Sequence, residues 1–128
     1  MTIVWTAQYR YNGPDRLDIT VKSGGGIGKA FAPTWQMVME YKNGQKVKAP
    51  NPEAYRTMIK QLQDNYTRMY EQMMRESLAN NRMAWDWLLS QRNITLVCFC
   101  PAGEFCHRVI LARDILKGAV DYKGERRL

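Results

Sequence analysis

The sequence predicts a single compact α/β domain, residues 1–128, in which a small, mostly parallel, Rossmann-like sheet is flanked by helices. Predicted segments follow the order strand, strand, helix, long helix, helix, strand, helix, strand. Of the 128 residues, 45% are hydrophobic and 24% are charged, which is ordinary for a chain that buries one core. We find no linker, internal repeat or low-complexity tract that would indicate a second domain.

The N-terminal third supplies two predicted strands and one helix. Residues 3–9 are rich in Val, Trp, Thr and Tyr, which favours a strand, and residues 12–15 form a turn. A second short strand covers residues 17–21, and a glycine-rich loop covers residues 23–30. A helix over residues 33–44 follows, because its first turn contains a proline and Asn-Gly ends it.

The longest predicted helix lies in the middle of the chain. Asn51 is a suitable N-cap, and Pro52 fits the first turn. Apolar residues then recur at helical spacing from Tyr55 to Met73. Core packing explains this stripe, and a homo-oligomer formed through helix 52–76 is the alternative, because methionine and tyrosine are favoured at interfaces. The remaining predicted elements are a helix, a buried strand, a helix and a short strand, at residues 82–91, 94–99, 104–117 and 119–122.

Charge and hydropathy narrow the partners that we expect. The formal net charge is +7, which favours anionic partners, either phosphate-bearing small molecules or, less strongly, nucleic acid. The longest apolar run is too short to cross a membrane, and the N-terminus has no signal-peptide pattern. We therefore expect a cytoplasmic protein with no membrane partner, and no motif calls for a cofactor.

All three cysteines and the only histidine lie within residues 98–107. Cys98 and Cys100 are two residues apart on a predicted strand, so both side chains point to one face. Cys106 and His107 fall in the first turn of the next predicted helix, where unpaired N–H groups favour negative charge. Helical angles place His107 away from the core and Arg108 on the flank of the buried stripe. Arg108 should therefore turn toward the N-terminal end of its helix and meet an anion in a solvent-open mouth.

Four interpretations of this cluster compete. In the first interpretation, Cys98 and Cys100 are simply small buried hydrophobic residues, and this description fits Cys98 better than Cys100. The second is a zinc site, but C-x-C and adjacent Cys-His spacings are unlike zinc knuckles, so we expect no metal. In the third, Cys106 or Cys100 is a catalytic nucleophile, with His107 as a base only if its side chain points back to a thiol. In the fourth, Arg108 and the helix N-terminus bind an anionic ligand without chemistry.

The glycine-rich loop is the second candidate for ligand binding. Its glycines allow backbone N–H groups to approach a phosphate, although the pattern is neither a P-loop nor a dinucleotide-binding turn. We expect Gly25, Gly26, Lys29 and Trp35 to close over a ligand, with Trp35 stacking on a base. Asp18, at the end of the second strand, would orient a hydroxyl group or the arginine of the cysteine cluster.

The stretch 96–116, with Cys98 and the triplet Cys106-His107-Arg108, resembles the C-terminal signature of the DUF488 family. Residues 17–24 and 32–35 also resemble phage and bacterial members of that family. The middle of the chain matches only as generic helix, and Cys100 is additional to the signature. The resemblance implies a small α/β fold but no agreed activity.

Together these features predict a protein that binds a phosphate-bearing small molecule, and a nucleotide or nucleotide derivative fits them best. In the phage setting that the resemblance implies, such a protein could sequester a signalling nucleotide. Arg108 and His107 would hold the ligand at the cysteine cluster. The alternatives are a cysteine-dependent enzyme acting on a nucleotide or nucleobase, and a nucleic-acid-binding accessory protein.

Overall fold

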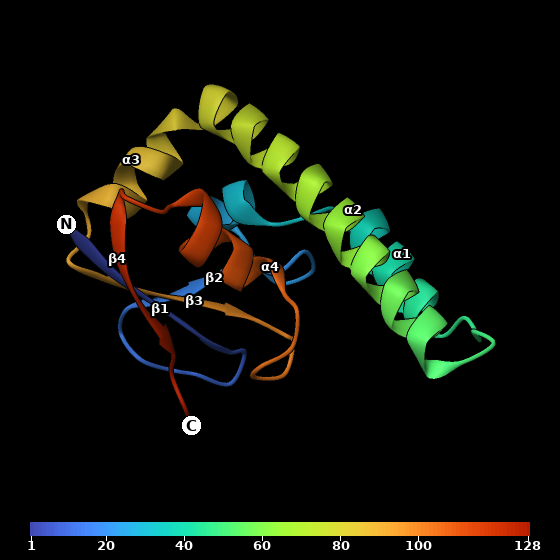
Figure 1. Cartoon of the computed structure of the whole chain (residues 1–128). Helices are drawn as coiled ribbons and strands as arrows, with labels where there is room; N and C mark the ends of the chain where they lie inside the picture. Colours follow the sequence, from blue (N-terminus) through green and yellow to red (C-terminus); the bar gives the residue numbers. More distant parts are fainter.

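The computed structural model describes all 128 residues and contains one four-stranded sheet (Figure 1). The strands are β1 (Thr2–Gln8), β2 (Arg16–Asp18), β3 (Asn93–Cys98) and β4 (Val120–Glu125). Their order is β2-β3-β1-β4, and every neighbouring pair is parallel. The predicted α/β class with a mostly parallel sheet is therefore confirmed, and the sheet is in fact wholly parallel.

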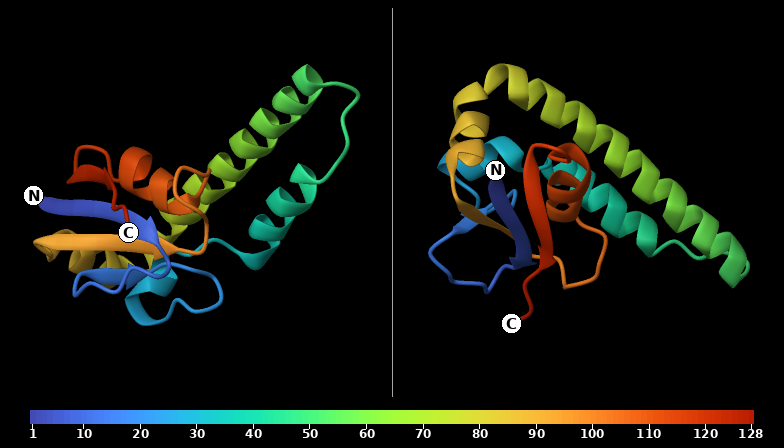
Figure 2. Two further views of the ribbon diagram at one scale, coloured as in Figure 1. Left: turned by 90° about the horizontal axis from the view of Figure 1, so that it is seen from below. Right: turned by 60° about the vertical axis from the view of Figure 1, so that its left-hand side comes forward.

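Helical segments cover both faces of this sheet. They are η1 (Gly26–Phe31), α1 (Trp35–Gln45), α2 (Pro52–Asn80), α3 (Arg82–Ser90), α4 (His107–Val109) and η2 (Ile110–Ile115). In the left panel of Figure 2, α4 and η2 lie on one face, and η1 and α3 lie on the other. Crossover connections between parallel strands produce this layering, because each connection must pack on a face of the sheet.

β1 and β3 lie within one residue of their predicted bounds, whereas β2 and β4 each end three residues away from the predicted position. The second strand ends at Asp18 rather than residue 21, because Asp18 Oδ1 accepts hydrogen bonds from Thr20 N at 2.9 Å and Thr20 Oγ1 at 2.6 Å. This turn takes the chain out of the sheet. The last strand continues to Glu125, where it still pairs with Thr6 of β1.

The last helix differs most from its prediction. It begins at His107 rather than residue 104, and after one α-helical turn it continues as the π-helical η2. A π-helix is wider than an α-helix, so side-chain angles calculated for 3.6 residues per turn do not apply. The prediction that His107 points away from the core is wrong, because its exposed fraction is only 5%.

The apolar stripe of α2 divides into two parts. Tyr66, Tyr70 and Met74 are buried in the core, which confirms core packing for the C-terminal half. The N-terminal half runs beside α1, and the two helices extend away from the sheet as an arm (Figure 2). Tyr55 and Met69 are partly exposed, and association through this helix stays a prediction.

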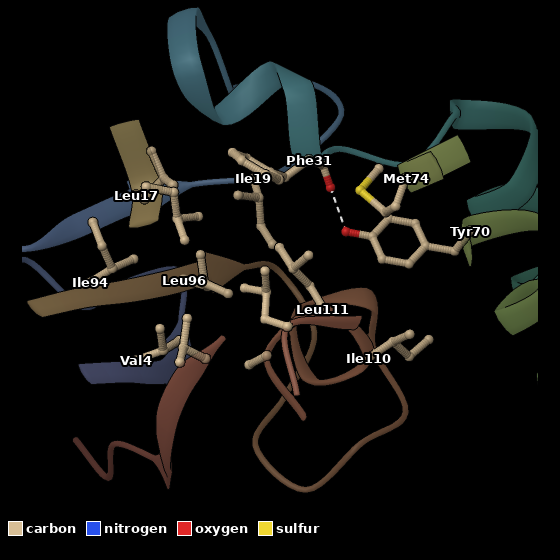
Figure 3. Close-up of a cluster of buried hydrophobic side chains, with 14 of the residues drawn as sticks. Val4, Leu17, Ile19, Phe31, Tyr70, Met74, Ile94, Leu96, Ile110 and Leu111 are labelled. Atoms are coloured by element: carbon tan, nitrogen blue, oxygen red, sulfur yellow. Dashed lines mark hydrogen bonds between the residues drawn. The ribbon is translucent and has the colours of Figure 1, made fainter. Parts of the chain in front are cut away.

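The core joins the sheet to the helices on both faces (Figure 3). Val4, Leu96 and Leu111 are fully buried within it, and each such side chain contributes about 1.5–3 kcal/mol by leaving water. Tyr70 donates a buried hydrogen bond of 2.7 Å to the carbonyl oxygen of Phe31, which attaches α2 to the end of η1. None of the helices combines the length and apolar character that crossing a membrane would require.

Candidate thiolate site

The candidate site lies at the carboxyl end of the sheet. Cys98 is the last residue of β3 and pairs with Gln8 at the end of β1. The chain then loops away from the sheet and returns at α4 (Figure 1). In parallel α/β sheets, ligands bind at this end of the strands.

A cavity of about 500 Å³ opens beside this loop. Its lining comes from residues 98–101 and 104–107, from residues 20–22, from Pro33 and α1, and from Tyr66 of α2. Ten of its 18 lining residues are hydrophobic. The cavity is therefore mainly apolar, with a few polar groups in defined positions, which is typical of small-molecule sites.

The sulfur atoms of Cys98, Cys100 and Cys106 lie within 4.8 Å of one another. Cys98 and Cys106 are buried, whereas Cys100 is partly exposed, and none forms a disulfide. All three line the cavity. The sulfurs of Cys98 and Cys100 are close, as the spacing predicts, although β3 ends at Cys98 and Cys100 lies in the bend that follows it rather than on the strand.

Arg108 is the buried cation of this cluster, with a side-chain exposure of 1%. Its Nη1 donates to Cys98 Sγ at 2.8 Å and lies 3.7 Å from Cys106 Sγ. Nε and Nη2 donate to the two carboxylate oxygens of Glu125, at 3.2 and 2.7 Å. Two backbone carbonyls, those of Cys100 and the following proline, accept the remaining bonds.

The strand order explains this arrangement. β3 and β4 lie on either side of β1, so Cys98 and Glu125 flank the end of the same central strand. Arg108 does meet anionic groups at the start of its helix, but these groups belong to the protein. It does not line the cavity, and its N–H groups are already bonded, so the expectation that it reaches into an open mouth to hold a phosphate is corrected.

The contacts of Cys98 favour its thiolate form. Hydrogen bonds from the thiols of Cys100 and Cys106, together with the charge of Arg108, hold the pKa of Cys98 far below its ordinary range although the sulfur is buried. A bond with Cys106 lowers the pKa of Cys100, but donation to Cys98 and burial outweigh it and raise that pKa to about 11. Burial, and then the two neighbouring sulfurs, raise the pKa of Cys106. These contacts therefore favour the thiolate at Cys98 and the neutral thiol at its two neighbours.

His107 is neutral and fixed by a backbone contact. Its Nε2 lies 2.8 Å from the carbonyl oxygen of Ile19, which can only accept, so Nε2 carries the proton. Burial lowers the pKa of His107. The unprotonated Nδ1 faces Cys106 Sγ at 3.6 Å, so the imidazole points back to a thiol, but to Cys106 rather than Cys98.

The three sulfur atoms are also the only grouping here that could hold a metal ion, which would be a thiophilic one. The grouping contains the three cysteines alone, so His107 does not complete a three-cysteine, one-histidine set.

Asp18 and the glycine loop lie outside the cavity. Asp18 binds Thr20, and its second carboxylate oxygen accepts from Ser23 Oγ at 2.8 Å, so both oxygens serve the turn rather than a ligand. Burial alone would raise the pKa of Asp18, but the bonds from Thr20 and Ser23 lower it overall. Gly25, Gly26 and Lys29 are exposed and do not line the cavity.

Trp35 is the one predicted ligand-closing residue that the cavity wall contains. The ammonium group of Lys22 lies 4.4 Å from the centre of its ring. Lys42 and the exposed Phe99 also line the cavity. Two aromatic rings and two cations therefore share one cavity with the three thiols.

Sequence reasoning did not single out Glu125, Lys22 or Lys42, and it assigned Cys98 to the core. Only the family resemblance placed Cys98 in the candidate site. The two-residue spacing between Cys98 and Cys100 is a local pattern that could also have indicated it, because such spacing brings two side chains to the same side of an extended chain. No local pattern connects Glu125 to Arg108, because β4 reaches the site through the order of the sheet.

A protein-family model described as DUF488-N3a, the active DUF488-N3 subclade, matches residues 25–119. No curated protein matches this chain, and no solved structure does.

Proposed function

From the premise that this chain belongs to the DUF488 family, in the subclade described as active, we propose that it is a cysteine-dependent enzyme acting on a nucleotide or nucleobase. Cys98 is the proposed nucleophile. One observation carries the proposal, namely the 2.8 Å contact between Cys98 Sγ and Arg108 Nη1 where Cys98 lines the cavity.

A thiolate is the reactive form of cysteine, and a nearby cation is the usual means of stabilising it. Arg108 supplies that cation without being exposed to solvent, since Glu125 and two carbonyls hold the rest of its guanidinium. The thiols of Cys100 and Cys106 are close enough to donate to Cys98, and either can return a proton to a leaving group.

The walls of the cavity support a planar, anionic substrate. Trp35 and Phe99 offer aromatic faces for a base, and Lys22 and Lys42 offer positive charge for a phosphate. These lysines replace Arg108 as the proposed phosphate ligands. A volume of about 500 Å³ is in the range of small-molecule sites, which suits one nucleotide.

A chloropurine nucleoside monophosphate tests the proposal directly. Attack by Cys98 on the chlorinated carbon would form a C–S bond and release chloride, so intact mass spectrometry should show one adduct per chain. Cys98→Ser should abolish the adduct, whereas Cys100→Ser should retain it. The rate should stay nearly constant from about pH 8.5 down to about pH 6, since the thiolate persists below the pKa of an ordinary thiol.

The role of the lysines has its own control. The chloropurine nucleoside without phosphate should react about tenfold more slowly, and the double variant Lys22→Ala/Lys42→Ala should remove that difference. Equal labelling of all three cysteines, with a rate that follows an ordinary thiol, would contradict the proposal.

Binding without chemistry is the second candidate, because the aromatic wall and the lysines favour a nucleotide whether or not a thiol reacts. Covalent labelling of the wild-type chain separates the two. A binding protein retains unmodified nucleoside monophosphates but forms no adduct with the chloropurine nucleotide, whereas the enzyme forms the adduct and loses it in Cys98→Ser.

A further inference from the structure

The sulfur cluster also has the geometry for oxidation. The sulfur atoms of three reduced cysteines lie within 4.8 Å of one another, two of them beside the Arg108 guanidinium, and they border a cavity wide enough for a small oxidant. We propose that hydrogen peroxide oxidises Cys98, which then closes a reversible disulfide with Cys106. The cluster would thus be a site of oxidative modification in the lining of the cavity.

Cys98 is the sulfur that reacts first. Arg108 Nη1 lies closest to it, at 2.8 Å, and thiolates rather than thiols attack peroxide. The Cys98 thiolate attacks one peroxide oxygen, so that an S–O bond forms and the O–O bond breaks. Cys98 is oxidised by two electrons to sulfenic acid, and the peroxide leaves as hydroxide.

Cys106 is the partner that closes the bond. The S–H proton of Cys106 passes to a hydroxide ion, and its sulfur attacks the sulfur of the Cys98 sulfenic acid. An S–S bond forms, the S–O bond breaks, and hydroxide leaves. The whole process consumes one thiolate, one thiol and one peroxide, and it yields the disulfide, one water and one hydroxide ion.

The arrangement of the sulfurs selects Cys106 over Cys100. Arg108 Nη1 contacts Cys98 Sγ and lies 3.7 Å from Cys106 Sγ, so both sulfurs border the same N–H group from different elements. A bridge between Cys98 and Cys100 would instead close a loop of only three residues, and such short loops are strained.

The oxidised form should remain folded. Arg108 loses the Cys98 thiolate but keeps both oxygens of Glu125 and the carbonyl of Cys100, so the buried guanidinium stays bonded. The cavity loses its nucleophile. This last consequence, inactivation by peroxide, rests on the proposed function, whereas formation of the disulfide does not.

The test uses the full chain, reduced and then treated with hydrogen peroxide in small molar excess. Alkylation should show the free thiols falling from three to one, and a dithiol reductant should restore them. Trypsin gives one peptide with all three cysteines, but a second protease that cuts after Glu104 separates residues 93–104 from residues 105–108. The two fragments should stay joined, with the alkyl group on Cys100.

Two serine variants distinguish formation of the Cys98–Cys106 disulfide from a general effect of misfolding. Cys100→Ser should still form the bond, whereas Cys106→Ser should stop at a Cys98 sulfenic acid that a 1,3-diketone captures. Three free thiols after treatment, a free fragment 105–108, or a bond between two molecules would overturn the proposal.

The covalent probe separates this inference from the proposed function. If the reduced chain reacts with the chloropurine nucleotide, the oxidised chain should lose that reaction and regain it on reduction. If the reduced chain never reacts, the proposed function fails, and the mapped disulfide still decides the inference by itself.

Discussion

Arg108 sets the chemistry of its neighbours because it is buried and permanently charged. A guanidinium has five N–H donors, and a buried one must have partners for them. Here the partners are a carboxylate, a sulfur and two backbone carbonyls. The same contacts that stabilise the cation therefore favour a thiolate at Cys98.

Replacing Glu125 by Gln tests this coupling at the level of one residue. The variant keeps an oxygen acceptor but removes the negative charge, so we expect a loss of roughly 2–3 kcal/mol in the free energy of unfolding. This is less than for a fully buried pair, because the Glu125 side chain is 21% exposed. Urea-induced unfolding measures the change.

The surface pair between Arg113 and Asp114 is the matched control, since their side chains are 62% and 44% exposed. Asp114→Asn should change stability by less than about 1 kcal/mol. Equal changes in the free energy of unfolding for the two substitutions would show that the buried Arg108–Glu125 pair stabilises the fold no more than a surface pair does.

At the scale of elements, the glycine segment acts by packing against β2. A Cβ atom on Gly28 would lie 1.9 Å from the carbonyl oxygen of Asp18, and one on Gly24 would lie 2.4 Å from that of Thr20. Gly28 therefore allows η1 to lie against the end of β2, and Gly24 allows the preceding segment to approach the backbone of Thr20. Their role is structural, whereas the sequence suggests a phosphate-binding loop.

Gly28→Ala should therefore destabilise the protein by about 1–3 kcal/mol, because backbone atoms must move to accept the methyl group. A thermal melt or urea titration measures the loss. Gly25→Ala is the matched control, since a Cβ there meets nothing within 4 Å and its backbone is extended. It should be neutral or slightly stabilising, and a similar loss in both variants would contradict the packing explanation.

Some helices and strands can be predicted from the local sequence pattern, and others cannot. The central helix and the strand at residues 93–98 follow from strong periodicity and an apolar run, and both are present. The last helix is where the pattern failed, because the helix begins three residues later than predicted and continues as a π-helix, to which α-helical spacing does not apply. For this reason the predicted helical angles place His107 away from the core, although its side chain is buried.

For the whole molecule, the three thiols should make stability depend on pH. The pKa of Cys98 in the folded chain lies far below its value of about 8.5 in an unfolded chain. At pH values between these two pKa values the unfolded state binds more protons, so the free energy of unfolding rises with pH. The folded pKa values of Cys100, about 11, and Cys106 are raised, so above about pH 8.5 the folded state binds more protons and stability falls. His107, whose folded pKa is lowered, adds a loss of stability below about pH 6.5.

We therefore expect maximal stability near pH 8.5 under reducing conditions, measured as the urea midpoint from about pH 5 to about pH 10. Cys98→Ala should remove the rise between about pH 6.5 and about pH 8.5 while leaving the loss due to His107 at lower pH. A wild-type curve that is flat or falling across that interval would contradict the thiolate at Cys98.

The sequence by itself determined the α/β class, the presence of the long helix and the grouping of three cysteines, a histidine and an arginine after one strand. These features depend on local spacing, which decides the face on which each side chain lies. Only the tertiary structure decided that Glu125 pairs with Arg108, that Arg108 contacts the sulfur of Cys98, and that Trp35 and Lys22 line the same cavity as the thiols. Such contacts depend on the order of strands and the packing of distant helices, because β4 reaches Arg108 only by lying beside β1.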